Sequence, residues 1–170
     1  MKTFTIILAL FALVCAVAAC GSGANVAPSN RAKPAPHAHG YHPPVPDAYK
    51  DRKPPAGMSL TDAAVIARGK ELFESPDAGN CISCHGNDGK GGGPLGANLD
   101  PKPGNLTDPE VHEHVSDAYI FWRIQTGNAG WGNHDGKVSG MLGYTKRGTD
   151  DEWDRDCWAL TAYVRSLNGK

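Results

Sequence analysis

Apolar side chains recur at helical spacing near the end of the chain. Five of them lie four, three, four and three positions apart: Trp153, Cys157, Leu160, Val164 and Leu167. This spacing places them on one face of an α-helix. The segment Thr149-Asp150-Asp151-Glu152, just before them, is typical of a capping box. We therefore predict a helix that begins near Thr149.

The same kind of pattern predicts two earlier helices. The first begins near Ser59, whose side chain can cap it, and carries an apolar stripe through Leu72 before Pro76 ends it. The second covers residues 116–126, and Gly127 is its stop signal. Each helix is short enough for a small domain.

Long loops separate these predicted helices. Residues 86–109 and 130–148 are dense in Gly, Pro, Asn and Asp, which favour turns over regular structure. The sequence indicates no convincing pair of strands. We therefore predict an all-α fold for residues 59–170, a small helical domain with long loops.

The start of the chain follows a different pattern, typical of an export signal. Lys2 precedes an apolar run, Phe4 to Val14, that is too short to span a bilayer comfortably. The run leads to Val17-Ala18-Ala19-Cys20, which resembles a bacterial lipobox, a signal whose cysteine receives lipid. We predict a lipoprotein signal peptide over residues 1–19 and lipidation of Cys20. Ordinary signal cleavage, with Cys20 incidental, is the alternative.

Residues 20–58 are predicted to form a lipid-anchored tether. Gly21 to Met58 contains eight prolines and few large apolar residues, a composition that keeps a chain extended and semi-rigid. We expect its histidines to be solvated rather than metal-bound: His37, His39 and His42. The whole chain has 17 Lys and Arg against 18 Asp and Glu, a net charge of −1, so no basic excess points to nucleic acid.

The strongest chemical signal is Cys81-Ile82-Ser83-Cys84-His85. Two thiols three positions apart can each add to a vinyl group of one porphyrin, and the histidine that follows is then held beneath the iron. This is the c-type haem attachment pattern. A thiol redox pair would usually lie beside a βαβ pattern, which is missing, and a zinc site would need a second pair of ligands. A structural disulfide is a further alternative after export.

Residues around this motif resemble the small monohaem cytochromes c of class I, over roughly Ala64 to Leu167. Gly69 and Phe73 stand where that family places a glycine and an aromatic residue in its first helix. Leu160 and Tyr163 stand where its last helix places their partners. The resemblance implies one covalent haem c and an electron carrier rather than an enzyme, with no small-molecule substrate.

The resemblance also implies roles around the iron. His85 would be one axial ligand, and the carbonyl of Pro94 would accept a hydrogen bond from its far ring nitrogen. Met141 would be the second axial ligand, although the family often has Met-Pro where this chain has Met141-Leu142. His134 is its main rival. Two other histidines are further candidates: His112 and His114.

Two side chains outside the motif complete the expectations. Arg123 could reach a haem propionate through a charge-assisted hydrogen bond, or it could be a solvated helix arginine. After removal of the signal peptide, which contains Cys15, Cys157 is the one thiol without a haem or lipid role, and we expect it to be buried as a small apolar residue.

Together these features predict a periplasmic electron-transfer protein that contacts a bacterial membrane through its N-terminal lipid. Gly21 after Cys20 is compatible with sorting to the outer membrane. Its partners would be redox proteins or a membrane respiratory complex. A fixed subunit of such a complex is one alternative, and a haem sensor or enzyme with an open iron site is another.

Overall fold

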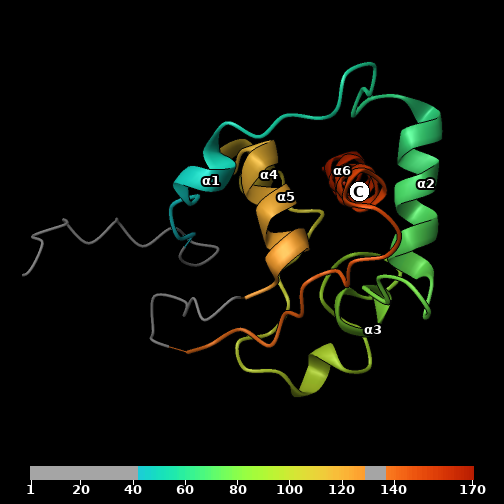
Figure 1. Ribbon diagram of the computed structural model, residues 1–170. Coiled ribbons are helices and arrows are strands. Elements are labelled where there is room, and N and C mark those ends of the chain that lie inside the picture. The colour runs from blue at the N-terminus through green and yellow to red at the C-terminus, as the bar shows by residue number, and fades with distance from the viewer. Residues whose placement is uncertain (1–41, 129–136) are drawn as a thin grey trace, which may run out of the picture. The chain divides into compact units, whose positions relative to one another are not determined.

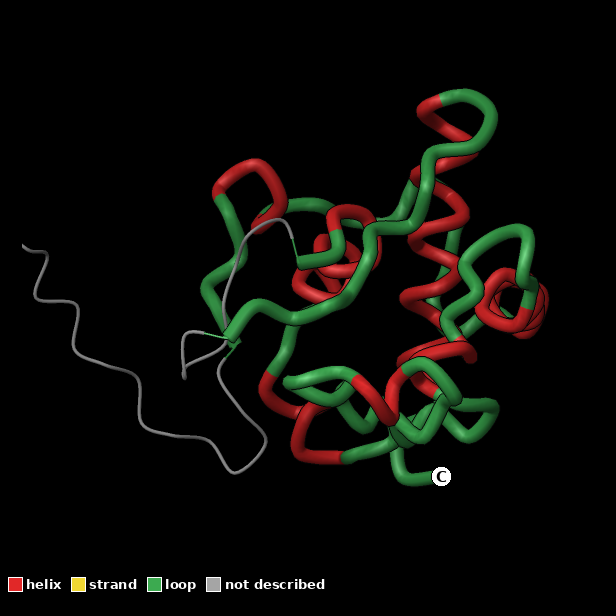
Figure 2. The backbone as a smooth tube through the Cα atoms, turned by 90° about the horizontal axis from the view of Figure 1, so that it is seen from below, coloured by secondary structure: helices red, strands yellow, loops and turns green. Residues whose placement is uncertain are grey.

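Six α-helices organise the residues that the computed structural model describes, 42–128 and 137–170 (Figure 1). The helices are α1 (Asp47–Lys50), α2 (Ala63–Glu74), α3 (Ile82–His85), α4 (Pro109–His114), α5 (Asp117–Thr126) and α6 (Asp150–Ser166). A 3-10 turn, η1, covers Gly96–Asn98. No strand occurs in these two ranges, so the predicted all-α fold is confirmed. Figure 2 shows how much of the described chain is loop.

The helix ends follow the local sequence closely. The hydroxyl of Ser116 accepts a hydrogen bond from the backbone N–H of Tyr119 at 3.1 Å and caps α5. Thr149 and Glu152 form the predicted capping box of α6. The predicted start of α2 at Ser59 is four residues early, because Asp62 caps the helix by accepting a bond from Ala64 N–H at 2.7 Å.

The core is built where α6 packs against α2 and α5, and α6 is viewed nearly end-on between them in Figure 1. Gly69 of α2 faces the α6 backbone, and a Cβ atom at this position would lie 2.0 Å from the Ala159 carbonyl oxygen. The rings of Phe73 and Tyr163 meet edge to face beside it, with centroids 5.1 Å apart. The glycine therefore permits the close crossing that the family resemblance implied.

Residues 42–58 pack against the helical domain instead of leaving it as a tether. The ring of Tyr49, in α1, lies 6.3 Å from that of Phe121 and 6.5 Å from that of Trp122. Arg52 pairs with Asp154 of α6 and covers the Phe121 ring at 5.2 Å. The domain thus includes part of the segment that the sequence analysis assigned to the tether. Because single side chains make these contacts, no periodic pattern in the sequence predicts them.

His42, expected to be solvated, instead lies against Tyr119, with Nδ1 3.3 Å from the Tyr119 hydroxyl. The other predictions about the N-terminal part fall on residues 1–41, outside the described ranges. They include the signal peptide over residues 1–19, lipidation of Cys20, and the solvated His37 and His39. Within 42–128 and 137–170, no helix is long and apolar enough to cross a bilayer.

Candidate functional site

The helix α3 brings the Cys-x-x-Cys-His motif together on a single turn. Its N-cap is Cys81, whose N–H donates to the Phe73 carbonyl at 3.0 Å, and His85 N–H donates to the Cys81 carbonyl at 2.8 Å. Residues three apart on a helical turn lie on one side of it, so Cys81 and Cys84 face the same way. Both thiols are half-buried and free of any disulfide. Burial raises the pKa of Cys81 to about 11. Because no disulfide engages them, both thiols are available for covalent attachment of a group.

The imidazole of His85 is held in one orientation by a backbone carbonyl. Its Nδ1 lies 3.2 Å from the oxygen of Gly104. A carbonyl oxygen can only accept, so Nδ1 carries the proton and Nε2 keeps its lone pair. Burial lowers the pKa of His85, and the bond to Gly104 raises it and so offsets part of that effect. A neutral, oriented imidazole with a free Nε2 is a metal ligand ready for use.

The hydrogen-bond acceptor differs from the one expected, because Gly104 stands where the sequence analysis placed the carbonyl of Pro94. The loop around Pro94 is bonded to α3 through its N–H groups instead. Gly93 N–H donates to the Cys84 carbonyl at 3.1 Å, and Leu95 N–H donates to the Ser83 carbonyl at 2.7 Å. The loop thus passes along the backbone of α3, while the later part of the same loop reaches the imidazole.

Met141 lies in a segment that is bonded to the end of α5. The backbone N–H of Asn128 donates to the Met141 carbonyl at 2.9 Å, and Tyr144 N–H donates to the Ile124 carbonyl at 2.7 Å. Met141 itself is half-buried. These contacts anchor its backbone, and its role as an iron ligand stays a prediction. Its main rival, His134, lies outside the described residues.

The other candidate histidines lie on α4. The Nε2–H of His112 donates to the Leu106 carbonyl at 2.7 Å, which leaves Nδ1 buried without a hydrogen bond in the described structure. The guanidinium of Arg165 holds the carbonyl of His112 at 2.8 Å. His114 is exposed near the end of the same helix. Nε2 of His112 therefore has a structural partner, whereas Nδ1 has none among the described residues.

The side chain of Arg123 stays close to its own helix. Its guanidinium lies 5.4 Å from the centroid of the Trp122 ring, and Nη2 lies 3.5 Å from Oδ1 of Asn128. Burial lowers the pKa of Arg123, although a guanidinium remains charged at neutral pH. Whether it meets a haem propionate stays a prediction.

Two buried donors that the sequence analysis missed carry no hydrogen bond in the described residues. They are Nδ2 of Asn128 and Nε1 of Trp158. A buried polar group without a partner costs about 1–3 kcal/mol, and no described protein group offsets that cost for these two donors. The two free thiols and the neutral His85 suit a covalently bound haem. Nothing in the local sequence distinguishes these two donors, because only the fold buries them.

The alternative readings of the cysteines find less support. The described residues contain no cluster of three or more His, Cys, Asp or Glu side chains that could hold a metal ion. Cys157 is fully buried in α6, as expected, and burial raises the pKa of its thiol. A buried, protonated thiol behaves as a small apolar residue.

The fold and the site together define a small helical domain that carries a haem attachment motif. The family model for cytochrome c matches residues 66–168, which is more than half of the chain. The chain therefore belongs to the cytochrome c family. Membership implies a covalently bound c-type haem and haem-based electron transfer.

Comparisons with curated proteins and with solved structures add little to this assignment to the family. No curated protein matches the chain. Among solved structures, the chain is similar to a chain of a reducing HAO-like protein complex from Kuenenia stuttgartiensis, with 25% identity and a TM-score of 0.48. The similar region covers 71% of this chain and 54% of that one. The chain thus spans about half the length of that protein.

Proposed function

We propose that this protein is a monohaem electron carrier with His85 and Met141 as the axial ligands of the iron. The observation that carries the proposal is the geometry of α3, which presents two free thiols and a neutral imidazole whose Nδ1–H is engaged by Gly104. Thioether bonds at Cys81 and Cys84 would hold one haem, and Nε2 of His85 would bind its iron.

The residues of the chain would set how readily the electron is gained and lost. A c-type haem, when bound, supplies an iron that alternates between the ferric and ferrous states. The hydrogen bond from His85 to Gly104 fixes the ring and increases the electron density on Nε2. The thioether of Met141 is a soft, neutral donor that favours ferrous iron and raises the potential. With both axial positions filled, no site remains for a substrate.

We further propose that the protein works at the periplasmic face of a bacterial membrane. A lipid on Cys20 would anchor it, and residues 21–41 would let the domain reach its partners. The outer membrane is the favoured site, because Gly21 follows Cys20. The partners would be redox proteins or a membrane respiratory complex, and neither nucleic acid nor a small-molecule substrate is expected.

The visible spectrum of the ferric, haem-loaded protein tests the axial ligation. The parent should show a weak sulfur–iron charge-transfer band at the red edge, and Met141→Ala should lose it. Met58→Ala is the matched control, because Met58 is also a partly buried methionine, packed against the core. It should keep the band. A parent without the band whose ferrous form rapidly binds carbon monoxide would contradict Met141 ligation and favour an open iron site.

A further inference from the structure

The segment that carries Met141 is held to the domain by very few side chains. Between residues 137 and 150, all of which the structure describes, Tyr144 is the one buried residue. Its exposed fraction is 6%, whereas that of Leu142 is 88%. A segment with so little buried apolar surface gains little from packing. Beyond the bond from Asn128 N–H to the Met141 carbonyl at 2.9 Å, its position therefore depends largely on the contacts of Tyr144.

The backbone of Tyr144 is bonded on both sides. Its N–H donates to the Ile124 carbonyl at the end of α5, at 2.7 Å. Its carbonyl accepts a bond from Nε1 of Trp153 in α6, at 3.0 Å. Close backbone approach adds to this, since a Cβ atom on Gly127 would lie 2.3 Å from the Gly143 nitrogen. These contacts seat the segment between α5 and α6.

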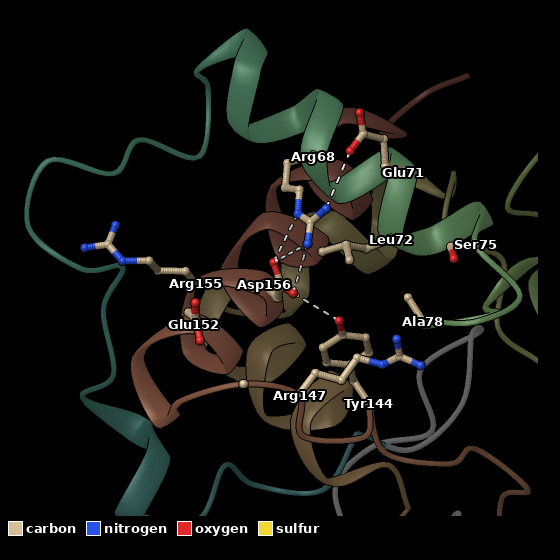
Figure 3. A pocket seen from close by; sticks show the side chains of 11 residues that line it. Arg68, Glu71, Leu72, Ser75, Ala78, Tyr144, Arg147, Glu152, Arg155 and Asp156 are labelled. Carbon is tan, nitrogen blue, oxygen red and sulfur yellow. Dashed lines mark hydrogen bonds and ion pairs between the residues drawn. The ribbon is translucent and has the colours of Figure 1, made fainter.

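The phenol of Tyr144 adds a third attachment, which runs through the carboxylate of Asp156 to the guanidinium of Arg68. Its hydroxyl donates to Oδ2 of Asp156 at 3.1 Å (Figure 3). Arg68 of α2 holds the same carboxylate, with Nε 3.2 Å from Oδ1 and Nη2 3.2 Å from Oδ2. Burial and the neighbouring Asp156 carboxylate raise the pKa of Tyr144 to about 12. The hydroxyl therefore stays protonated at neutral pH and remains a donor.

This attachment lies in the wall of an open pocket of about 590 Å³ between α2 and the start of α6. Figure 3 shows the ring of Tyr144 and the guanidinium of Arg68 on either side of Asp156. A hydrogen bond to a charged carboxylate is stronger than one between neutral groups. Arg68 holds both oxygens of the Asp156 carboxylate, one of which accepts from the phenol, so the three residues act as one anchor.

We propose that Tyr144, aimed by Asp156 and Arg68, is a positioning residue for Met141; the inference rests on the proposed His85/Met141 ligation. Leu142, next to Met141, is 88% exposed and adds no packing that would hold the segment. The anchor to α2 does hold it, through the buried ring of Tyr144 three residues further on. The same helix leads to Cys81, whose N–H donates to the Phe73 carbonyl at 3.0 Å. The anchor thus joins the segments that would carry the two axial ligands.

Paired tyrosine variants of the haem-loaded protein test the inference. Tyr144→Phe removes the hydroxyl and keeps the ring. Tyr163→Phe makes the same change at a residue that is also 6% exposed but packs against Phe73. Two readouts are measured: displacement of the sulfur ligand from ferric iron by added imidazole, and hydrogen exchange of the amides in residues 137–148.

We expect imidazole to bind Tyr144→Phe at least about tenfold more tightly than the parent, the factor that corresponds to losing a hydrogen bond to a charged group. Amide exchange in residues 137–148 should also accelerate. Tyr163→Phe should match the parent in both readouts. Arg68→Gln should change both in the same direction as Tyr144→Phe, and the double variant should add little, because both changes act on one anchor.

The outcomes separate this inference from the proposed ligation. If the parent lacks the sulfur–iron band, the proposed His85/Met141 ligation fails, and the inference built on it falls with it. If the band is present and Tyr144→Phe binds imidazole no more tightly than Tyr163→Phe does, the positioning role is overturned, whatever the exchange rates. A tighter complex in Tyr144→Phe alone, with faster exchange of residues 137–148, supports it.

Discussion

Replacing Gly69 by alanine tests the helix crossing on which the site is built. A Cβ atom at Gly69 would lie 2.0 Å from the carbonyl oxygen of Ala159 and 2.8 Å from the Cβ atom of Tyr163. The closest of these atoms belongs to the backbone of α6, so no change of rotamer can move it aside. The variant can fold only if α2 and α6 separate.

Two opposing effects decide the magnitude. Alanine favours a helix over glycine by about 1 kcal/mol. Forcing an extra methyl group into a packed core costs about 1–3 kcal/mol, and more where the backbone must shift. Because the clash at Gly69 is with backbone, we place its cost at or above the upper end of that range. The expected net loss in the free energy of unfolding is about 2 kcal/mol.

Urea unfolding of the haem-loaded protein measures this loss. Ala67→Gly, two positions earlier in α2 and exposed, is the matched control, because it reports the helix propensity alone and should cost about 1 kcal/mol. If Gly69→Ala proves as stable as the parent, or more stable, the close crossing does not constrain the fold, and our reasoning about α2 and α6 is wrong.

Two further predictions concern the capping box and the N-terminus. The backbone N–H and the hydroxyl of Thr149 donate to Glu152 at 2.8 and 3.0 Å, and these bonds lower the pKa of Glu152 below its usual 4.5. The ionised Glu152 carboxylate therefore stabilises the fold above pH 4.5, and this stabilisation is lost as the pH falls through the lowered pKa. Glu152→Gln should be less stable than the parent near neutral pH, and the difference should vanish in acid. Unfolding measured across pH checks this, and a difference that stays constant with pH would contradict it. If Cys20 carries lipid, Cys20→Ser should shift the protein from the membrane fraction to the soluble fraction in cell fractionation, and an unchanged distribution would exclude lipid at Cys20 as its anchor.

Sequence alone determined the features that depend on neighbouring residues. Helix signals are local, so the helix over residues 116–126 and the capping box at Thr149 with the helix that follows it could be predicted. The haem attachment motif is equally local, because five consecutive residues carry its chemistry. The crossing at Gly69 was accessible only through the family resemblance, since spacing within one helix does not reveal its partner.

Tertiary structure alone decided which distant groups meet. The acceptor for His85 is Gly104, 19 positions away, although the resemblance favoured Pro94. Asp156 accepts from the phenol of Tyr144, and Arg68, which holds Asp156, lies 88 positions before it. Residues 42–58 joined the domain through single side chains such as Tyr49, without any periodic pattern. Each of these contacts depends on where the folded chain places a partner, and that position is not encoded in the residues on either side.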